Sequence, residues 1–342
     1  MRTHPAPTEC EVIQPATPRG QILTPLILIH DGGGTTFAYH CLSQLAGRAV
    51  FGIANPRFHS GVPWEGGVPE MAAAYLQMIR STVTKGREFP AQAPYSYGTT
   101  ADGGRLKRRR ILLGGWSLGG LLSLEIARLV GEEDRDVEIV GLLFVDSVYP
   151  VWPKGSEVKI GRFVEDEKLE TEEPKNVRLA KRAMKMAGQA VRVWTMPRCG
   201  AASETEVEVP KAVGYADADS SDGGGERAGP TADEADVEKD FYVSKEEKET
   251  AEVMWERPPR AVLVKAKEHV PMPIEGISSV DVYRGDEKLG WDGYCPGFVE
   301  EVLLTEGSHF DMFAWANCDG ITEKINEACQ ILEGVTIRGG RK

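Results

Sequence analysis

The sequence predicts an α/β fold with a mostly parallel central sheet flanked by helices. Short, wholly apolar segments alternate along its 342 residues with segments in which apolar residues recur at helical spacing. In addition, a Gly-x-Ser-x-Gly pentapeptide stands where one apolar segment ends and a helical one begins. Short apolar runs bounded by turn residues are typical of strands buried on both faces, which indicates a parallel sheet covered by helices on both sides.

The individual elements follow from the same patterns. Pro69 falls in the first turn of one helical segment, where its missing N–H is not needed, and Gly131 is placed to end another. The elements expected in chain order are strands over residues 26–29 and 50–53, a helix over 67–83, a strand over 111–113, a helix over 121–130, strands over 140–145, 261–264 and 298–304, and a helix over 321–332.

The remaining segments define the domain organisation. Residues 85–110 are expected to be irregular, and the basic residues 107–110 are interpreted as a solvated loop that enters a strand rather than as a localisation signal. A long insertion interrupts the core and is expected to be a mobile lid, helical near residues 176–194 and disordered near 217–240. The expected parts are a flexible arm over residues 1–22, an α/β-hydrolase core over 23–150 and 258–334, a lid over 151–257 with an acidic tract over about 201–256, and a tail over 335–342.

Composition excludes several classes of function. A net charge of −12 argues against binding to nucleic acid or to anionic membrane surfaces. No apolar run approaches the roughly 18 residues that a membrane span needs, and no apolar segment of signal-peptide length follows Met1, so a cytoplasmic protein is expected. The six cysteines lack zinc-site spacing, so reduced thiols are expected, with no metal and no bound cofactor.

The pentapeptide at residues 115–119 is interpreted as a nucleophile elbow centred on Ser117. Such a sharp turn from strand to helix requires small neighbours on both sides, and Gly115, Gly119 and Gly120 meet that need. A serine hydroxyl is a poor nucleophile by itself, so Ser117 needs a general base and an acid that orients the base.

Chain order narrows the choice of base, because in α/β hydrolases the acid and then the histidine follow the serine. Two histidines follow Ser117, and His309 is the expected base because it comes directly after the last predicted strand, with His269 as the alternative. For the acid, Asp146 ends the strand after the nucleophile helix, whereas the alternative, Glu268, follows the next strand. Both carboxylates would lie at the carboxyl edge of the sheet, where active sites of open α/β sheets collect.

An oxyanion hole would complete this machinery. It requires one N–H from the residue after the nucleophile, here Leu118, and one from the loop after an early strand. The triple glycine at residues 32–34 is in that position and supplies the second donor through Gly32. A phosphate-binding role is disfavoured, because the lysine and Ser/Thr of a P-loop are absent here.

With these residues assigned, the chain resembles the thioesterase domain family of polyketide and non-ribosomal peptide synthases, a branch of the α/β hydrolases. The resemblance spans about residues 25–332 without the lid, and its acid position favours Asp146. It rests on residues 29–34 with Phe37 and Tyr39 behind them, on 114–120, on 144–147, and on 289–292 leading into 307–310.

The resemblance implies that Ser117 attacks an acyl thioester and that water, or a nucleophile within the acyl chain, resolves the acyl-enzyme. The acyl group would be carried on the phosphopantetheine of an acyl carrier protein or synthase, or on coenzyme A. No carrier segment flanks the hydrolase region, so a free-standing, fungal-type enzyme of polyketide or related secondary metabolism is expected. The alternatives are a carboxylesterase or lipase with the same residues, and a catalytically silent hydrolase-fold binding protein.

Overall fold

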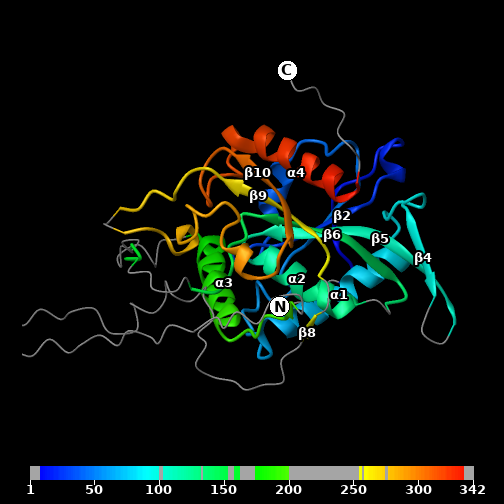
Figure 1. Cartoon of the computed structure of the whole chain (residues 1–342), viewed down its shortest axis with the longest axis horizontal. Coiled ribbons are helices and arrows are strands. Elements are labelled where there is room, and N and C mark those ends of the chain that lie inside the picture. Colours follow the sequence, from blue (N-terminus) through cyan, green and yellow to red (C-terminus); the bar gives the residue numbers. More distant parts are fainter. Residues whose placement is uncertain are drawn as a thin grey trace, which may run out of the picture.

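A mostly parallel β-sheet forms the centre of the molecule, with helices on both faces (Figure 1). The computed structural model describes residues 8–99, 103–131, 134–152, 158–161, 174–199, 254–255, 258–273 and 276–334. Within this part of the chain the large sheet has eight strands, in the order β1-β3-β2-β5-β6-β9-β10, with β4 paired to β5. These strands are β1 (Glu11–Gln14), β2 (Leu26–Ile29), β3 (Val50–Ile53), β4 (Tyr95–Thr99), β5 (Arg105–Trp116), β6 (Val137–Val145), β9 (Ala261–Ala266) and β10 (Val299–Thr305).

Only β1 and β4 run antiparallel to their neighbours in this sheet, so the prediction of a mostly parallel sheet is confirmed. The four strands β2, β5, β6 and β9 are adjacent and parallel. Their carboxyl ends therefore meet along one edge of the sheet, which is where residues that follow these strands must gather.

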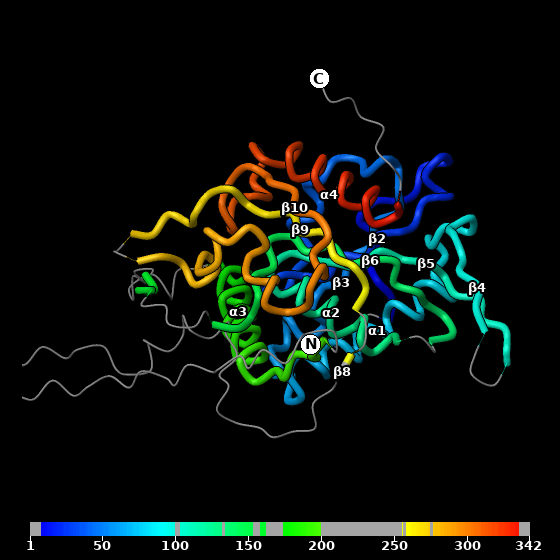
Figure 2. Tube along the Cα trace, viewed as in Figure 1, coloured from blue at the N-terminus to red at the C-terminus, as the bar shows by residue number. Residues whose placement is uncertain are grey.

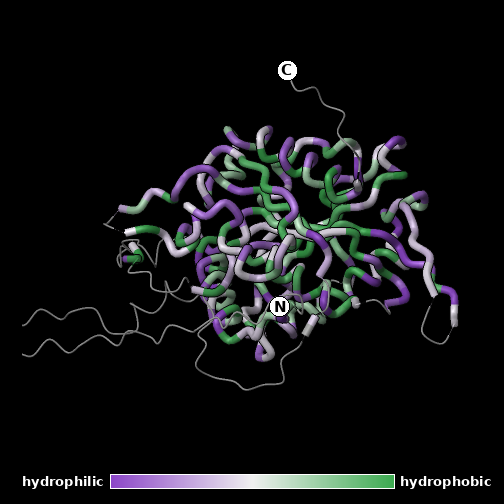
Figure 3. Tube along the Cα trace, viewed as in Figure 1, coloured by the Kyte–Doolittle hydropathy of each residue, from purple (hydrophilic) through white to green (hydrophobic). Residues whose placement is uncertain are grey.

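The sheet is covered on both faces, as its apolar strands require. Alternate residues of β2 point to opposite faces, with Ile27 and Ile29 in one core cluster and Leu26 and Leu28 in the other. Helices α1 (Gly67–Lys85) and α2 (Leu118–Val130) pack into the first cluster, and α4 (Cys318–Leu332) packs into the second. The tube in Figure 3 is accordingly most apolar through the sheet at the centre.

The amino-terminal and basic segments differ from the prediction. Glu11–Gln14, expected in a flexible arm, forms β1 and pairs with β3. The interpretation of residues 107–110 as a loop is wrong, because all four belong to β5, and residues 107–109 pair with β4 in an antiparallel ribbon. Aromatic contacts stabilise these cations in a strand: the Arg109 guanidinium lies 3.9 Å and the Lys107 ammonium 4.1 Å from the centroid of the Tyr95 ring.

The helical part of the insertion is α3 (Lys175–Arg192), which packs against α1 beside the core (Figure 2). Two short strands that the sequence did not predict, β7 (Arg198–Cys199) and β8 (Met254–Trp255), pair nearby. A disulfide joins Cys199 to Cys295, which corrects the expectation of six reduced thiols. Because the two cysteines are separated by 96 positions in the sequence, their spacing gave no sign of the pair. The expected disorder near residues 217–240 and the expected tail over 335–342 lie outside the described residues.

The division into arm, core, lid and tail stays a prediction. In the part of the chain that the structure covers, no helix has both the length and the apolar character that crossing a bilayer would require.

A buried ion pair fastens the end of α4 to the sheet and provides a test of the fold. Arg48 Nη2 lies 2.7 Å from Glu333 Oε2, and the side chains are 1% and 11% exposed. Arg48→Met leaves the Glu333 carboxylate without its cation, so we expect a loss of about 3 kcal/mol in the free energy of unfolding, measured by urea denaturation. In the control Lys324→Met, which removes the partly exposed pair with Glu327, the change should stay below about 0.5 kcal/mol. Equal losses in the free energy of unfolding for Arg48→Met and Lys324→Met would show that the buried ion pair does not stabilise the fold.

Candidate active site

Ser117 occupies a strained turn between β5 and α2. Its φ of 54° and ψ of −114° lie in a region that residues other than glycine rarely adopt. The Ser117 N–H donates to the carbonyl of Val145 at 2.9 Å, so the neighbouring strand β6 holds the turn in place. The predicted elbow is therefore present in the backbone.

The glycines around Ser117 are explained by close approach to β2. A Cβ atom at Gly115 would lie 2.5 Å from the carbonyl oxygen of Ile29, and a Cβ atom at Gly119 would meet the same oxygen. Because real Cβ atoms do not come this near a carbonyl, any side chain at either position would push the elbow away from β2.

Three residues from distant parts of the chain meet at this elbow. His309 Nε2 lies 3.1 Å from Ser117 Oγ, and His309 Nδ1 lies 2.7 Å from Asp146 Oδ2. In the series, the serine hydroxyl donates to Nε2 while Nδ1–H donates to the carboxylate. Since Asp146 is fully buried and His309 is 2% exposed, bulk water does not compete for the bond between them.

The alternative acid and base that the sequence offered do not take part in these hydrogen bonds. Glu268 and His269 are both exposed beyond the end of β9. The Glu268 backbone N–H donates to the carbonyl of Gly307, and in the described residues its carboxylate makes no bond to His309. Of the candidates, the structure brings together Ser117, Asp146 and His309.

The carboxylate of Asp146 is held by more donors than the sequence suggested. Besides His309, the Ala266 N–H donates to Oδ1 at 2.9 Å, and the Arg284 guanidinium donates to Oδ1 and Oδ2 at 2.6 Å each. Burial by itself would raise the pKa of Asp146, but the hydrogen bonds from Arg284 and His309 outweigh it and hold that pKa well below its usual range. Asp146 is therefore ionised throughout the neutral range.

The two residues expected to form an oxyanion hole both line the same cavity beside Ser117. Leu118 is the first residue of α2, where backbone N–H groups have no acceptor within the helix. Gly32 approaches from the loop after β2. Tyr39 ties these two segments together, because its hydroxyl donates to the Ile29 carbonyl at 2.6 Å and accepts from the Trp116 N–H at 2.9 Å.

A buried histidine supports the loop that carries Gly32. His30 Nδ1 lies 2.5 Å from the Asp31 carbonyl oxygen, and Nε2 lies 2.6 Å from the Tyr75 hydroxyl. Burial lowers the pKa of His30 to about 4, so at neutral pH the imidazole is uncharged. Nδ1–H then donates to Asp31 while Tyr75 donates to Nε2, and both bonds fix the direction of the loop.

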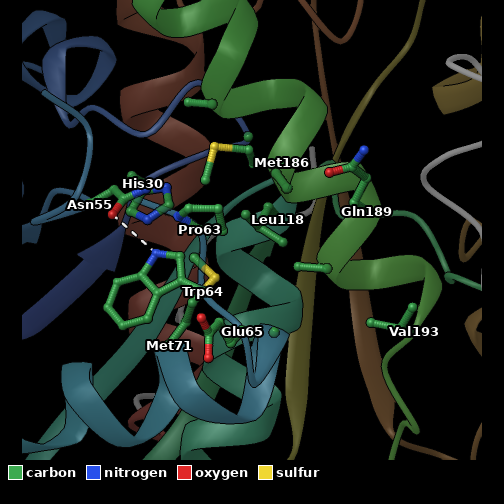
Figure 4. A pocket seen from close by; sticks show the side chains of 15 residues that line it. His30, Asn55, Pro63, Trp64, Glu65, Met71, Leu118, Met186, Gln189 and Val193 are labelled. Carbon is green, nitrogen blue, oxygen red and sulfur yellow. Dashed lines mark hydrogen bonds between the residues drawn. The ribbon is translucent and has the colours of Figure 1, made fainter. Parts of the chain in front are cut away.

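A mainly apolar cavity of about 230 Å³ lies next to Gly32 and Leu118 (Figure 4). In Figure 4, Met186, Gln189 and Val193 come from α3 and its end, while His30, Asn55 and Trp64 face them from the core. Trp64 is held by a hydrogen bond from its Nε1 to Asn55 Oδ1 at 3.3 Å. The helical character of this part of α3 could be predicted from the sequence. Its place as a cavity wall could not, because that depends on how α3 packs on α1.

The parallel sheet, the elbow and the residues gathered at the carboxyl edge define an α/β hydrolase. No family model matches the chain. It is 32% identical over 327 residues to the probable thioesterase lcsE of Purpureocillium lilacinum, with 92% of this chain and 91% of that protein covered. It is 28% identical over 351 residues to thioesterase frbD of Dothideomycetidae sp. (strain 11243), with both chains covered completely. The chain belongs to the thioesterase family of the α/β hydrolases and is an enzyme of hydrolase type.

A similar segment also occurs within a much larger protein. The chain is 26% identical over 315 residues to 8% of the nonribosomal peptide synthetase imqB of Aspergillus flavus. Among solved structures, the thioesterase domain of NocB from the nocardicin cluster aligns with a TM-score of 0.49 and 18% identity, covering 92% of this chain and 94% of that one.

The bridge made by Tyr39 can be tested through stability. Tyr39→Phe leaves the Trp116 N–H and the Ile29 carbonyl without their buried partner, so we expect a loss of about 1–3 kcal/mol in the free energy of unfolding, measured by urea denaturation. The exposed Tyr97 provides the matched control, and Tyr97→Phe should change stability by less than about 0.5 kcal/mol. A Tyr39→Phe protein as stable as this control would show that the bridge is unimportant.

Proposed function

We propose that the chain is a serine thioesterase that releases acyl groups from thioesters through an acyl-enzyme on Ser117. The observation that carries this proposal is the hydrogen-bonded series from Ser117 through His309 to Asp146, set in a nucleophile elbow. Its relatives that are named thioesterases support the thioester as the bond that is cleaved.

The first half of the reaction forms the acyl-enzyme. His309 Nε2 accepts the proton of the Ser117 hydroxyl while Oγ attacks the thioester carbonyl. The carbon–sulfur bond then breaks, and the sulfur leaves as a thiol with the proton that His309 held. Asp146 remains ionised and stabilises the imidazolium that exists between these two transfers.

The tetrahedral intermediate carries a negative charge on the former carbonyl oxygen. We assign its stabilisation to the backbone N–H groups of Leu118 and Gly32, which both border the cavity beside Ser117. In the second half of the reaction, His309 activates water, or a hydroxyl or amine of the acyl chain itself, to release the acyl group by hydrolysis or cyclisation. Every step is assigned to groups of this chain, without a cofactor.

The cavity beside the elbow is the proposed site of the acyl chain. Its lining is mainly apolar, and an apolar cavity of about 150 Å³ holds benzene, so 230 Å³ accommodates a somewhat larger apolar group. Helix α3 forms one wall, which gives this part of the insertion the role of a lid over the bound acyl group.

The matching segment within a nonribosomal peptide synthetase supports a synthase or acyl carrier protein as the partner that delivers the substrate. We propose that the acyl group arrives on phosphopantetheine, either of such a carrier or of coenzyme A, in polyketide or related secondary metabolism.

Replacement of the nucleophile provides the direct kinetic test. Ser117→Ala should lower turnover of acyl thioesters by at least about 10⁴-fold and abolish labelling by a fluorophosphonate, since loss of one member of such a series removes the activated nucleophile. The control Ser60→Ala, at an exposed position, should retain both properties. Retained turnover in Ser117→Ala would contradict the mechanism.

The same assays separate the alternative functions. Faster cleavage of matched oxygen esters than of thioesters would identify a carboxylesterase, and a wild-type protein that is neither labelled nor active would identify a binding protein.

The assignment of the cavity can be tested by partly filling it from α3. Ala187 is buried and lines the cavity, so Ala187→Leu should reduce the room for the acyl chain. We expect kcat/KM for an octanoyl thioester to fall about 10-fold relative to that for an acetyl thioester. Val177→Leu, at an exposed position of the same helix, should leave this ratio unchanged. An unchanged ratio in Ala187→Leu would place the acyl chain elsewhere.

A further inference from the structure

Asp146 lies at one end of a buried network of charged side chains. The other members, Arg284 and Asp281, have no role in the mechanism proposed above. We infer that Arg284 and Asp281 act together as positioning residues: Arg284 orients the Asp146 carboxylate, and Asp281 balances the charge of Arg284, so that His309 still faces one net negative charge. This inference rests on the proposed function, because it concerns how His309 gains and loses a proton during that reaction.

The geometry of the arginine is that of a two-pronged clamp. Arg284 Nη1 donates to Asp146 Oδ1 and Nη2 donates to Oδ2, each at 2.6 Å. Nη1 also donates to the Ala266 carbonyl at 3.0 Å, which fixes the guanidinium against the end of β9. Because both carboxylate oxygens are engaged, the plane of the carboxylate is set, and Oδ2 is directed at His309 Nδ1.

A second carboxylate completes the network on the far side of the arginine. Arg284 Nε donates to Asp281 Oδ1 at 2.9 Å, and the Val270 N–H donates to Asp281 Oδ2 at 2.6 Å. The side chains of Arg284, Asp281 and Asp146 are at most 2% exposed. Hydrogen bonds engage both oxygens of Asp281, so its carboxylate is held in place.

The charges in this network decide how strongly it stabilises the imidazolium. While His309 is neutral, the ionised Asp146, Asp281 and Arg284 together carry one net negative charge, and protonation of His309 brings the group to neutrality. Without Asp281, the arginine would cancel the charge of Asp146, and the imidazolium would lose its stabilisation. In a site from which water is excluded, such interactions are only weakly screened.

Other charged groups near His309 stay the same in the variants proposed below. Asp31, after β2, interacts electrostatically with His309, and burial raises the pKa of Asp31 to about 6. Lys265 of β9 interacts with Arg284 and Asp146, and its ammonium donates to the Asp286 carbonyl at 2.5 Å. Asp311, on the loop of His309, accepts from the Ser308 hydroxyl and N–H. Because Asp31 itself titrates within the pH range of these profiles, each profile is also measured with Asp31→Asn.

The test is the pH dependence of kcat/KM for an acyl thioester, with enzyme concentration set by fluorophosphonate labelling. Asp281→Asn makes the resting network neutral, so the acidic limb should move to lower pH by about one unit. Arg284→Met leaves Asp146 and Asp281 without the cation that bridges them, so the limb should move to higher pH by a similar amount. The double variant restores one net negative charge, and its limb should return to within about 0.3 unit of the wild-type position.

Two further variants separate charge from geometry. Arg284→Lys keeps the charge but lacks the two-pronged fork, so kcat should fall about 10-fold while the limb stays in place. Arg80→Met breaks a pair with the buried Asp134 far from the elbow and should leave the limb unchanged. If Arg284→Met does not fold, the acidic limb of Asp281→Asn and the kcat of Arg284→Lys still test the roles of charge and of orientation.

Coincident acidic limbs in wild type and Asp281→Asn would overturn the inference and show that the network is only structural. This outcome is distinct from failure of the proposed function. If Ser117→Ala is inactive and the limbs coincide, the serine mechanism holds and only the role of Arg284 and Asp281 is wrong. If Ser117→Ala retains activity, the proposed function fails first.

Discussion

The buried carboxylate of Asp146 is the interaction on which the arrangement of the site depends. It accepts hydrogen bonds from the backbone of Ala266 at the end of β9, from Arg284 in the segment that follows, and from His309 after β10. The Asp146 N–H in turn donates to the Val264 carbonyl at 2.7 Å. Segments that follow Asp146 by 120 to 163 residues are thus joined at one carboxylate. This junction holds the imidazole of His309, whose Nε2 lies 3.1 Å from Ser117 Oγ.

The elbow and the partners of Ser117 could be predicted from the sequence because both follow from general geometry. Glycines on each side of Ser117 indicate that two backbone segments approach closely. The carboxyl ends of parallel strands bring Asp146 and His309 to the same edge of the sheet. Arg284 and Asp281 could not be found this way. They lie in an irregular segment whose residues show no periodicity, so nothing in the sequence indicated which way their side chains point.

The other differences have physical causes of the same kind. Clustered cations usually lie in loops, but those at the start of β5 lie in a strand. The contact between the Arg109 guanidinium and the ring of Tyr95 on the adjacent strand stabilises them there. The cavity wall depends on the packing of α3 against α1, a tertiary contact that helical periodicity does not reveal. In the proposed function, the core supplies the reacting residues, and the wall from the insertion shapes the space for the acyl group.

In the proposed mechanism, Ser117 carries the acyl group as a covalent intermediate. Its formation is tested most directly by intact-mass spectrometry of the protein after brief mixing with a panel of acyl thioesters, followed by peptide mapping. If Ser117 is the nucleophile, the mass should increase by the acyl group minus one hydrogen. The increase should be located on the peptide that contains Ser117 and should be absent in Ser117→Ala. An acyl group found on any other residue, or thioester turnover in the wild type together with an unmodified Ser117 under every quenching condition, would contradict it.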